Sequence, residues 1–228
     1  MPSTIQVQRS ITLASAFVRY APLTMSANDP ALSNADWVRQ FILGAPFAWR
    51  WNRVVTSFTT TIGKTDYTES LPALGWIEKA VGYLPTDGDI TFELEVENNL
   101  MVETRPNQPT KISAQLDDDN GNITFRLFPA PDQIYNIEVT YQMAAPTFTA
   151  LTQTWAPIPD YYSYLFNQGL LSKTLEYLND PRFQTSMQLF LQQVVSANEG
   201  LSDAQKSIFL FDRLNEQRQT QNVAKGTA

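Results

Sequence analysis

The sequence predicts an α+β fold, in which short N-terminal helices and three C-terminal helices form a helical scaffold around a central antiparallel β region. Two patterns lead to this prediction. Apolar and polar residues alternate over residues 123–142, as in strands, and apolar residues follow helical spacing after Asp160. Between the two patterns lie Pro146, Pro157 and Pro159, which continue neither a helix nor a central strand. The chain therefore changes from strands to helices across this proline segment.

Four segments follow from these patterns. They are an N-terminal helical segment (1–52), an antiparallel β region (53–145), a C-terminal helical region (146–214) and a flexible tail (215–228). The tail is polar and has no apolar periodicity, so we expect it to be ordered only by a partner.

Two helices are predicted in the N-terminal segment. Residues 4–20 carry apolar side chains at i, i+3 and i+7. A second helix is expected to begin at Ser33 or Asn34 as N-cap, with Asp36 in its favourable first turn, and to end at Leu43 before a glycine and a proline.

An aromatic segment, FAWRWN (47–52), follows the second helix. We interpret it as a core anchor where helix meets sheet. The alternative is a stacking platform for sugars or bases, which an acidic chain makes less favourable.

The β region is predicted from period-2 alternation and turn residues. Strands are expected at 53–62, within 67–83, at 89–97, at 110–116, at 123–128 and at 134–142. Leu71-Pro72 places the second stretch at an edge or in a loop, because proline cannot donate to a ladder. Asn120-Gly121 predicts a tight hairpin turn between 110–116 and 123–128.

Three helices are predicted after the prolines. The first covers 160–178 with an apolar stripe of Tyr161, Tyr164, Leu165, Leu171, Leu175 and Leu178. Asp180-Pro181 suits the start of the second, which is expected to bury Phe183, Met187, Phe190, Leu191 and Val194. Ser202 and Gln205 form a capping box for the third, whose expected apolar face is Ile208, Phe211 and Leu214.

Composition argues against an enzyme. The 228 residues include no cysteine and no histidine, which removes thiol nucleophiles, the commonest general base and the commonest zinc ligands. The run Asp117-Asp118-Asp119 lacks the spacing of a calcium loop and is interpreted as a solvated turn. We expect no catalytic site, no cofactor and no metal.

The charge balance limits the partners. Sixteen basic against twenty-three acidic residues give a net charge of −7, which does not suit sequence-independent binding of phosphates. No basic, apolar leader and no long apolar run is visible, so neither secretion nor membrane insertion is expected.

Several sequence words give a family resemblance. FAWRW after a short helix, YTESLP before a strand, RLFPAPDQIYNIEVTYQ (126–142) and APIPDYYSYLFNQGLLSKTLEYLNDP (156–181) are similar to words in head-to-tail adaptor, or connector, proteins of tailed bacteriophages. The resemblance implies a structural virion protein, assembled in the host cytoplasm. Copies of it, usually twelve, would form a ring below the portal and extend the DNA channel toward the tail.

The resemblance also implies sites and partners. The expected partners are the portal protein, other neck and tail proteins and further copies of the chain, with DNA passing through and no membrane involved. An acidic lumen would prevent DNA from sticking. The candidate channel-lining residues are Glu93, Glu95, Glu97, Asp117, Asp118 and Asp119, and the candidate portal-docking residues are Arg213, Arg218 and Lys225.

Three alternatives remain open at this point. The first is another tail, neck or baseplate protein of a phage. The second is a carbohydrate-binding module that stacks sugars on Trp49, Trp51 and Trp76. The third is a hydrolase based on Asp and Glu, for which Glu93, Glu95 and Glu97 would be the nearest candidates.

Overall fold

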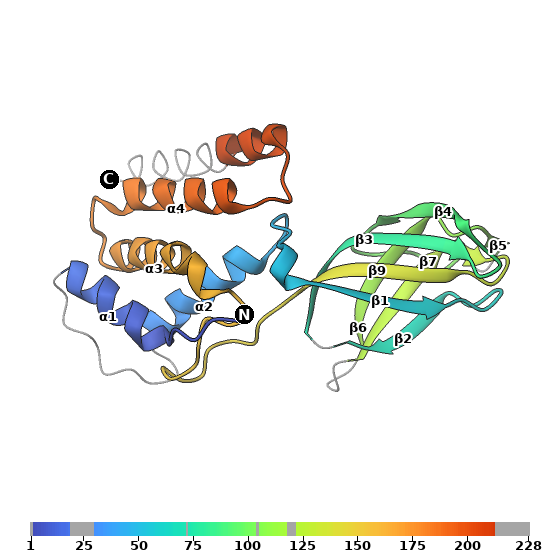
Figure 1. Cartoon of the computed structure of the whole chain (residues 1–228), viewed down its shortest axis with the longest axis horizontal. Helices are drawn as coiled ribbons and strands as arrows, with labels where there is room; N and C mark the ends of the chain where they lie inside the picture. The colour runs from blue at the N-terminus through green and yellow to red at the C-terminus, as the bar shows by residue number, and fades with distance from the viewer. Residues whose placement is uncertain (1, 19–29, 72, 104, 118–121, 213–228) are drawn as a thin grey trace. The chain divides into compact units, whose positions relative to one another are not determined.

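The computed structural model describes residues 2–18, 30–71, 73–103, 105–117 and 122–212 (Figure 1). It divides into two compact units, each with its own apolar core. The helical unit comprises Met1–Trp51 and Ala145–Ala228, and the β unit comprises Asn52–Ala144. The predicted α+β class is confirmed, and the N-terminal and C-terminal helical segments share one core.

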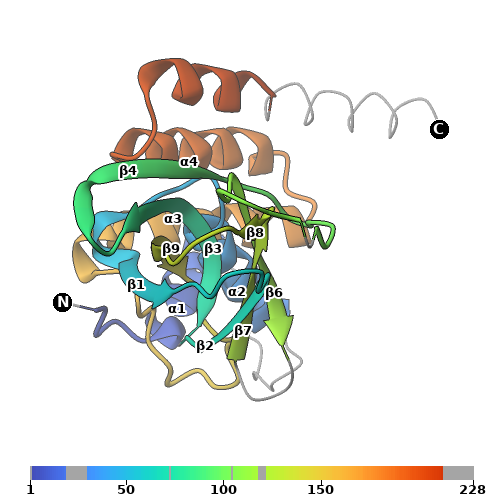
Figure 2. The same cartoon turned by 90° about the vertical axis from the view of Figure 1, so that its right-hand side faces the viewer.

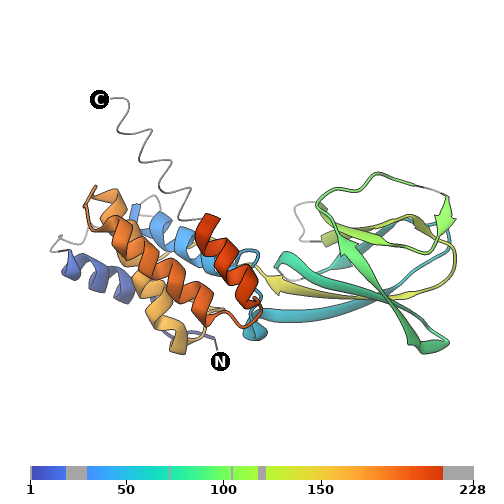
Figure 3. The same ribbon diagram turned by 90° about the horizontal axis from the view of Figure 1, so that it is seen from above.

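The helical unit is built around a central helix. Its elements are α1 (Val7–Phe17), α2 (Pro30–Leu43), the 3₁₀ turns η1 (Arg50–Asn52) and η2 (Asp160–Tyr162), α3 (Ser163–Tyr177) and α4 (Phe183–Ala197). Residues 203–212 are also helical. Because α3 packs against α1, α2 and α4 (Figures 1 and 3), segments from both halves of the sequence bury a shared core.

The predicted start of α2 is wrong. The helix already includes Pro30, a residue that suits the first helical turn because its N–H is missing. Ser33 and Asn34 therefore lie inside the helix and are not its N-cap. The Asp36 carboxylate instead accepts a hydrogen bond from the backbone N–H of Phe148 at 2.7 Å.

The predicted faces of two C-terminal helices are also wrong in part. Tyr161 and Tyr164 are exposed, whereas Phe166 is fully buried and stacks on Trp155 with ring centroids 4.5 Å apart. In the helix at 203–212, Ile208 and Phe211 are exposed. Phe209 packs on Phe47 instead, at 5.1 Å between ring centroids. Leu214 lies outside the described residues.

Of the two predicted helix starts, the capping box at Ser202 is confirmed, whereas Asp180 is not the N-cap of α4. Ser202 and Gln205 form the capping box, with the Ser202 N–H donating to Gln205 Oε1 at 2.9 Å and the Gln205 N–H donating to Ser202 Oγ at 3.3 Å. Asp180 accepts a bond from the Arg182 N–H at 2.9 Å. Its turn precedes α4, which begins at Phe183 rather than at Pro181.

The β unit is mostly but not wholly antiparallel. Its strands are β1 (Arg53–Thr59), β2 (Asp66–Ser70), β3 (Leu74–Leu84), β4 (Asp87–Val96), β5 (Pro106–Asn107), β6 (Lys111–Asp117), β7 (Asn122–Phe128), β8 (Ala130–Pro131) and β9 (Asn136–Met143). Seven strands form one sheet in the order β1-β9-β3-β4-β6-β7-β2. β4 pairs with β6 in parallel, and so does β5 with β8, which corrects the prediction of a purely antiparallel region.

The seven-stranded sheet curls around a single core (Figure 2). Tyr135, Ile137, Val139 and Tyr141 are all buried, as the alternation in the last strand predicts. The hairpin is confirmed, since β6 and β7 pair from Lys111↔Phe128 to Asp117↔Asn122. The stretch expected within 67–83 forms two strands, and the edge position predicted from Leu71-Pro72 is confirmed for β2 but wrong for β3, which lies between β9 and β4.

Candidate assembly surfaces

Two glutamates of β4, and Glu97 directly after it, have solvent-exposed side chains on the β unit. The side chains of Glu93 and Glu95 are 72% and 68% exposed, and that of Glu97 is 35% exposed. Leu94, between the first two, is buried in the core. The glutamates and Leu94 therefore lie on opposite faces, as the alternation in 89–97 indicates, whereas Val96, on the side of Leu94 by the same alternation, is 39% exposed.

Two lysines lie between these glutamates, and the sequence pattern does not predict this arrangement. Lys79 Nζ lies 4.0 Å from Glu93, and Lys111 Nζ lies 3.7 Å from Glu95 and also bonds Glu97. The pKa of Lys111 is raised, first by the hydrogen bond to Glu97. The two lysines offset part of the charge, so the row is less acidic than three glutamates alone.

A fourth carboxylate extends this face. Val81 is paired with Glu93 on one side and with Glu138 on the other, and residues directly opposite in a sheet share a face. Glu138 is exposed and lies two strands from Glu93, roughly 10 Å away. The apolar–polar alternation in residues 134–142 already indicates that the Glu138 side chain points away from the core. We call Glu93, Glu95, Glu97 and Glu138 the acidic face.

Other predicted site residues cannot be placed. Asp118 and Asp119 of the hairpin turn lie outside the described residues, as do Arg213, Arg218 and Lys225 of the tail; Asp117 is placed only as the last residue of β6. Among the described side chains, no group of three or more Asp or Glu residues is arranged to hold a metal. Within the same part of the chain, no helix is long and apolar enough to span a bilayer.

The aromatic segment 47–52 anchors the helical core. Trp49 is only 2% exposed, and its indole N–H donates to the Ile42 carbonyl at 2.7 Å. Since its ring faces are buried, Trp49 cannot stack on a sugar, and the proposed platform of three tryptophans loses one member. Trp76 belongs to the β unit.

One end of this segment lines a pocket at the surface of the helical unit. The pocket has a volume of about 380 Å³ and is lined by Ala48, Trp49, Arg50, Trp51, Tyr161, Tyr162 and Glu199. The Tyr162 ring lies 6.0 Å from Trp51 and 4.4 Å from Tyr161 between centroids. Arg50 and Glu199 form an ion pair at 3.1 Å with both side chains well exposed. We call this site the aromatic pocket.

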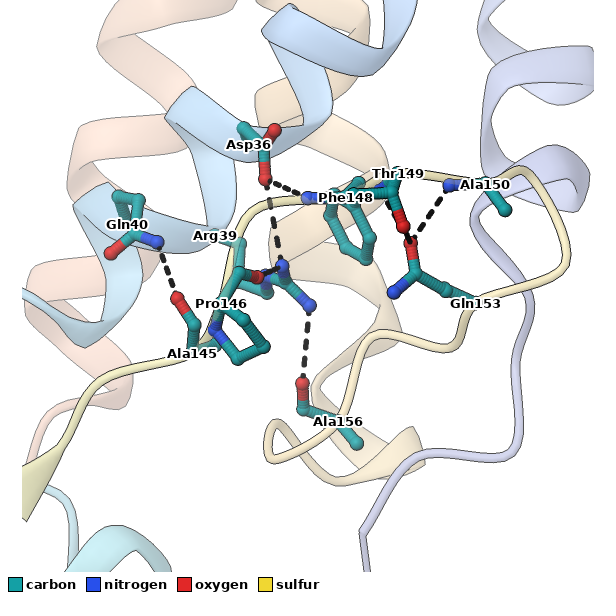
Figure 4. Close-up of polar contacts among 10 residues, drawn as sticks. All are labelled: Asp36, Arg39, Gln40, Ala145, Pro146, Phe148, Thr149, Ala150, Gln153 and Ala156. Atoms are coloured by element: carbon teal, nitrogen blue, oxygen red, sulfur yellow. Dashed lines mark hydrogen bonds and ion pairs between the residues drawn. The ribbon is translucent and has the colours of Figure 1, made fainter. Parts of the chain in front are cut away.

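A buried arginine fixes the proline segment onto α2 (Figure 4). Arg39 donates to the carbonyls of Pro146 and Ala156 and lies 3.4 Å above the Phe148 ring centroid. Asp36, one turn earlier on α2, lies 3.5 Å from the guanidinium. No sequence pattern predicts this role of Arg39, because the role depends on backbone carbonyls more than a hundred residues away.

Burial affects the charge of this arginine. The Arg39 side chain is only 4% exposed, and burial lowers its pKa to about 10, while Asp36 acts in the opposite direction. The guanidinium still carries its charge at neutral pH. It therefore provides charged hydrogen bonds to the proline segment.

The N-terminal segment is tied to the start of α3. The Asp160 carboxylate accepts bonds from the Ser3 hydroxyl, from the Thr4 N–H at 3.0 Å and from the Thr4 hydroxyl at 2.7 Å. These bonds lower the pKa of Asp160 to about 2, with Ser3 as the first cause. Residues before α1 thus form part of the helical unit.

Comparison with known proteins gives one family. The model of the SU10 adaptor protein family matches residues 11–224, which include parts of both units. No curated protein matches the chain.

Proposed function

The chain belongs to the SU10 adaptor protein family, and from this premise we propose that its copies form a closed ring below the portal and extend the DNA channel toward the tail. Membership makes it a phage adaptor protein, a virion component that associates with other head and tail proteins. The match over residues 11–224 carries the proposal, because it covers nearly the whole chain. We propose twelve copies, a structural role and no catalysis.

The acidic face is our candidate for the channel lining. Its exposed carboxylates would repel DNA phosphates and keep the passing DNA from sticking. Lys79 and Lys111 weaken this repulsion without reversing it, since four carboxylates face two ammonium groups. We propose Asp117, Asp118 and Asp119 as further rim residues, and Arg213, Arg218 and Lys225 as the docking residues for the portal.

Reconstitution with the portal tests this function. Purified chain is mixed with the portal of the phage that encodes it, and the product is measured by native mass spectrometry and electron microscopy. We expect a ring of adaptor copies on the tail-facing side of the portal. A chain that ignores the portal and binds the tail tube would instead be another neck or tail component.

A further inference from the structure

We propose that the aromatic pocket binds an arginine side chain of a second copy, namely its Arg9, and so forms the contact between neighbouring subunits. This inference rests on the proposed ring and identifies the surfaces that build it. Both surfaces belong to the helical unit.

The pocket has the chemistry of a cation site. Trp51, Tyr161 and Tyr162 are among the residues that line it, and the faces of aromatic rings attract a guanidinium or ammonium group through their quadrupoles. Glu199 adds a full negative charge at the same place. The pKa of Tyr162 is raised, mainly by burial, with Tyr161 and Glu199 adding to the shift. The aromatic rings and the carboxylate of Glu199 together favour a positive group in the pocket.

The cation already present does not fill the site. Arg50 pairs with Glu199, but the two side chains are 79% and 61% exposed. Ion pairs this exposed contribute little and exchange readily. An incoming guanidinium that also stacks on the rings would gain more from the pocket than Arg50 gains from Glu199 alone.

Among the described cationic side chains, Arg9 is the best candidate to enter the aromatic pocket of a neighbouring copy. Among the described cations of the helical unit, only Arg9 and Lys206 have no ion pair. Lys206 is half-buried, and Leu210, four residues on, packs against the core. Arg9 is exposed at the start of α1 and is followed by Leu13 and Phe17, 52% and 62% exposed, at i+4 and i+8. This side of α1 presents a cation and then two apolar side chains.

The surface beside the pocket complements this pattern. Tyr164 lies 6.3 Å from Tyr162 between ring centroids and is exposed. It also lines a shallow depression with Leu189, which is 46% exposed. Four helical residues advance about 6 Å, so an Arg9 seated against Tyr162 would carry Leu13 toward Tyr164. This arrangement places the Arg9 cation in the aromatic pocket and the apolar Leu13 side chain against the exposed Tyr164 ring.

The symmetry of the contact fits a ring. Donor and acceptor are different surfaces of the same chain, so the interface is heterologous. Repeating such a contact closes into a ring when its rotation divides a full turn.

Charge exchange tests the inference. Assembly of the full chain, alone and with the portal, is followed by mass photometry for Arg9→Glu, Glu199→Arg and the double variant. We expect each single change to raise the concentration needed for assembly about tenfold or more, and the double variant to recover most of the loss. Lys206→Glu is the matched control and should assemble like the unmodified chain.

A second pair of variants separates stacking from charge. Tyr161→Ala should weaken assembly, whereas Tyr177→Ala, at a similarly exposed tyrosine of α3 outside the pocket, should not. Circular dichroism verifies that each variant is folded. Rings that form equally well with Arg9→Glu and Tyr161→Ala would overturn the inference and leave the proposed function intact. If the unmodified chain forms no ring even on the portal, the proposed function itself fails.

Discussion

Replacing Arg39 by methionine tests whether the buried guanidinium stabilises the helical unit. Methionine keeps an unbranched apolar stem but removes the charge and all donors. The carbonyls of Pro146 and Ala156 lose a charged donor, at about 1.5–3 kcal/mol for each hydrogen bond to a charged group, with the 3.4 Å bond to Ala156 at the low end. The contact with the Phe148 ring contributes a further 1–2 kcal/mol or so. The losses sum to about 5 kcal/mol.

An opposing effect reduces this loss. Burial lowers the pKa of Arg39 from 12.5 to about 10, which corresponds to a cost of about 3 kcal/mol for keeping the charge inside the protein. Methionine removes that cost. We therefore expect Arg39→Met to lower the free energy of unfolding of the helical unit by about 2 kcal/mol, because the lost contacts outweigh the recovered desolvation.

The assay is denaturation of the full chain by urea, followed by circular dichroism at 222 nm, where the helical unit dominates. The matched control is Arg182→Met, which removes an exposed ion pair with Asp180 and should change the free energy by less than about 0.5 kcal/mol. Equal effects of the two substitutions would refute the reasoning, and a stabilised Arg39→Met would show that desolvation outweighs the contacts.

Three further predictions address pH, packing and charge. The folded-state pKa of Asp160 is about 2 against an ordinary 3.8, so the stabilisation by its carboxylate is complete above about pH 4 and is lost as the pH falls toward 2. The Tm of Asp160→Asn should therefore decline less steeply between pH 5 and 2 than the Tm of the unmodified chain. An equally steep decline would contradict this reasoning. A methyl group at Gly169 of α3 would lie 2.7 Å from fully buried side chains of α2 and α4. Gly169→Ala should therefore lower the free energy of unfolding, measured in urea, by about 1–3 kcal/mol, although alanine has the better helix propensity. An increase in the free energy of unfolding would contradict this prediction. The double variant Glu93→Lys/Glu95→Lys should make assembled rings retain DNA in a filter-binding assay at low salt, whereas the control Asp203→Lys in the helical unit should not. If rings of the double variant stay free of DNA, the acidic face does not line the channel.

Local patterns predicted most elements of the fold. The alternation in β9, the hairpin of β6 and β7 and the capping box at Ser202 depend on residues close in sequence, so the sequence contains the whole signal. The parallel pairing of β4 with β6 has no such signal. It depends on the irregular segment between them, whose residues show no periodicity.

Side-chain environments were predicted less well. Helical spacing places Tyr161 and Tyr164 near Leu165, but the buried face of α3 is decided by α1, α2, α4 and the stack of Phe166 on Trp155. The sequence places Asp36 in the first turn of its helix, yet it lies further inside α2 and accepts a hydrogen bond from the backbone N–H of Phe148. The acidic row was found by alternation, whereas its lysine partners come from β3 and β6 and require knowledge of the strand order.

The topology places the acidic face and the aromatic pocket, the two proposed assembly surfaces, on separate units. The β unit is a continuous insertion, Asn52–Ala144, between the two halves of the helical unit. Its first and last strands pair directly, from Arg53↔Gln142 onward, so the sheet itself holds the entry and exit points of the insertion together. The helical core then needs no residue of the insertion to close. Substitutions on the acidic face should therefore leave the aromatic pocket and α1 unaffected, so the proposed channel lining and the proposed subunit contact are testable independently of each other.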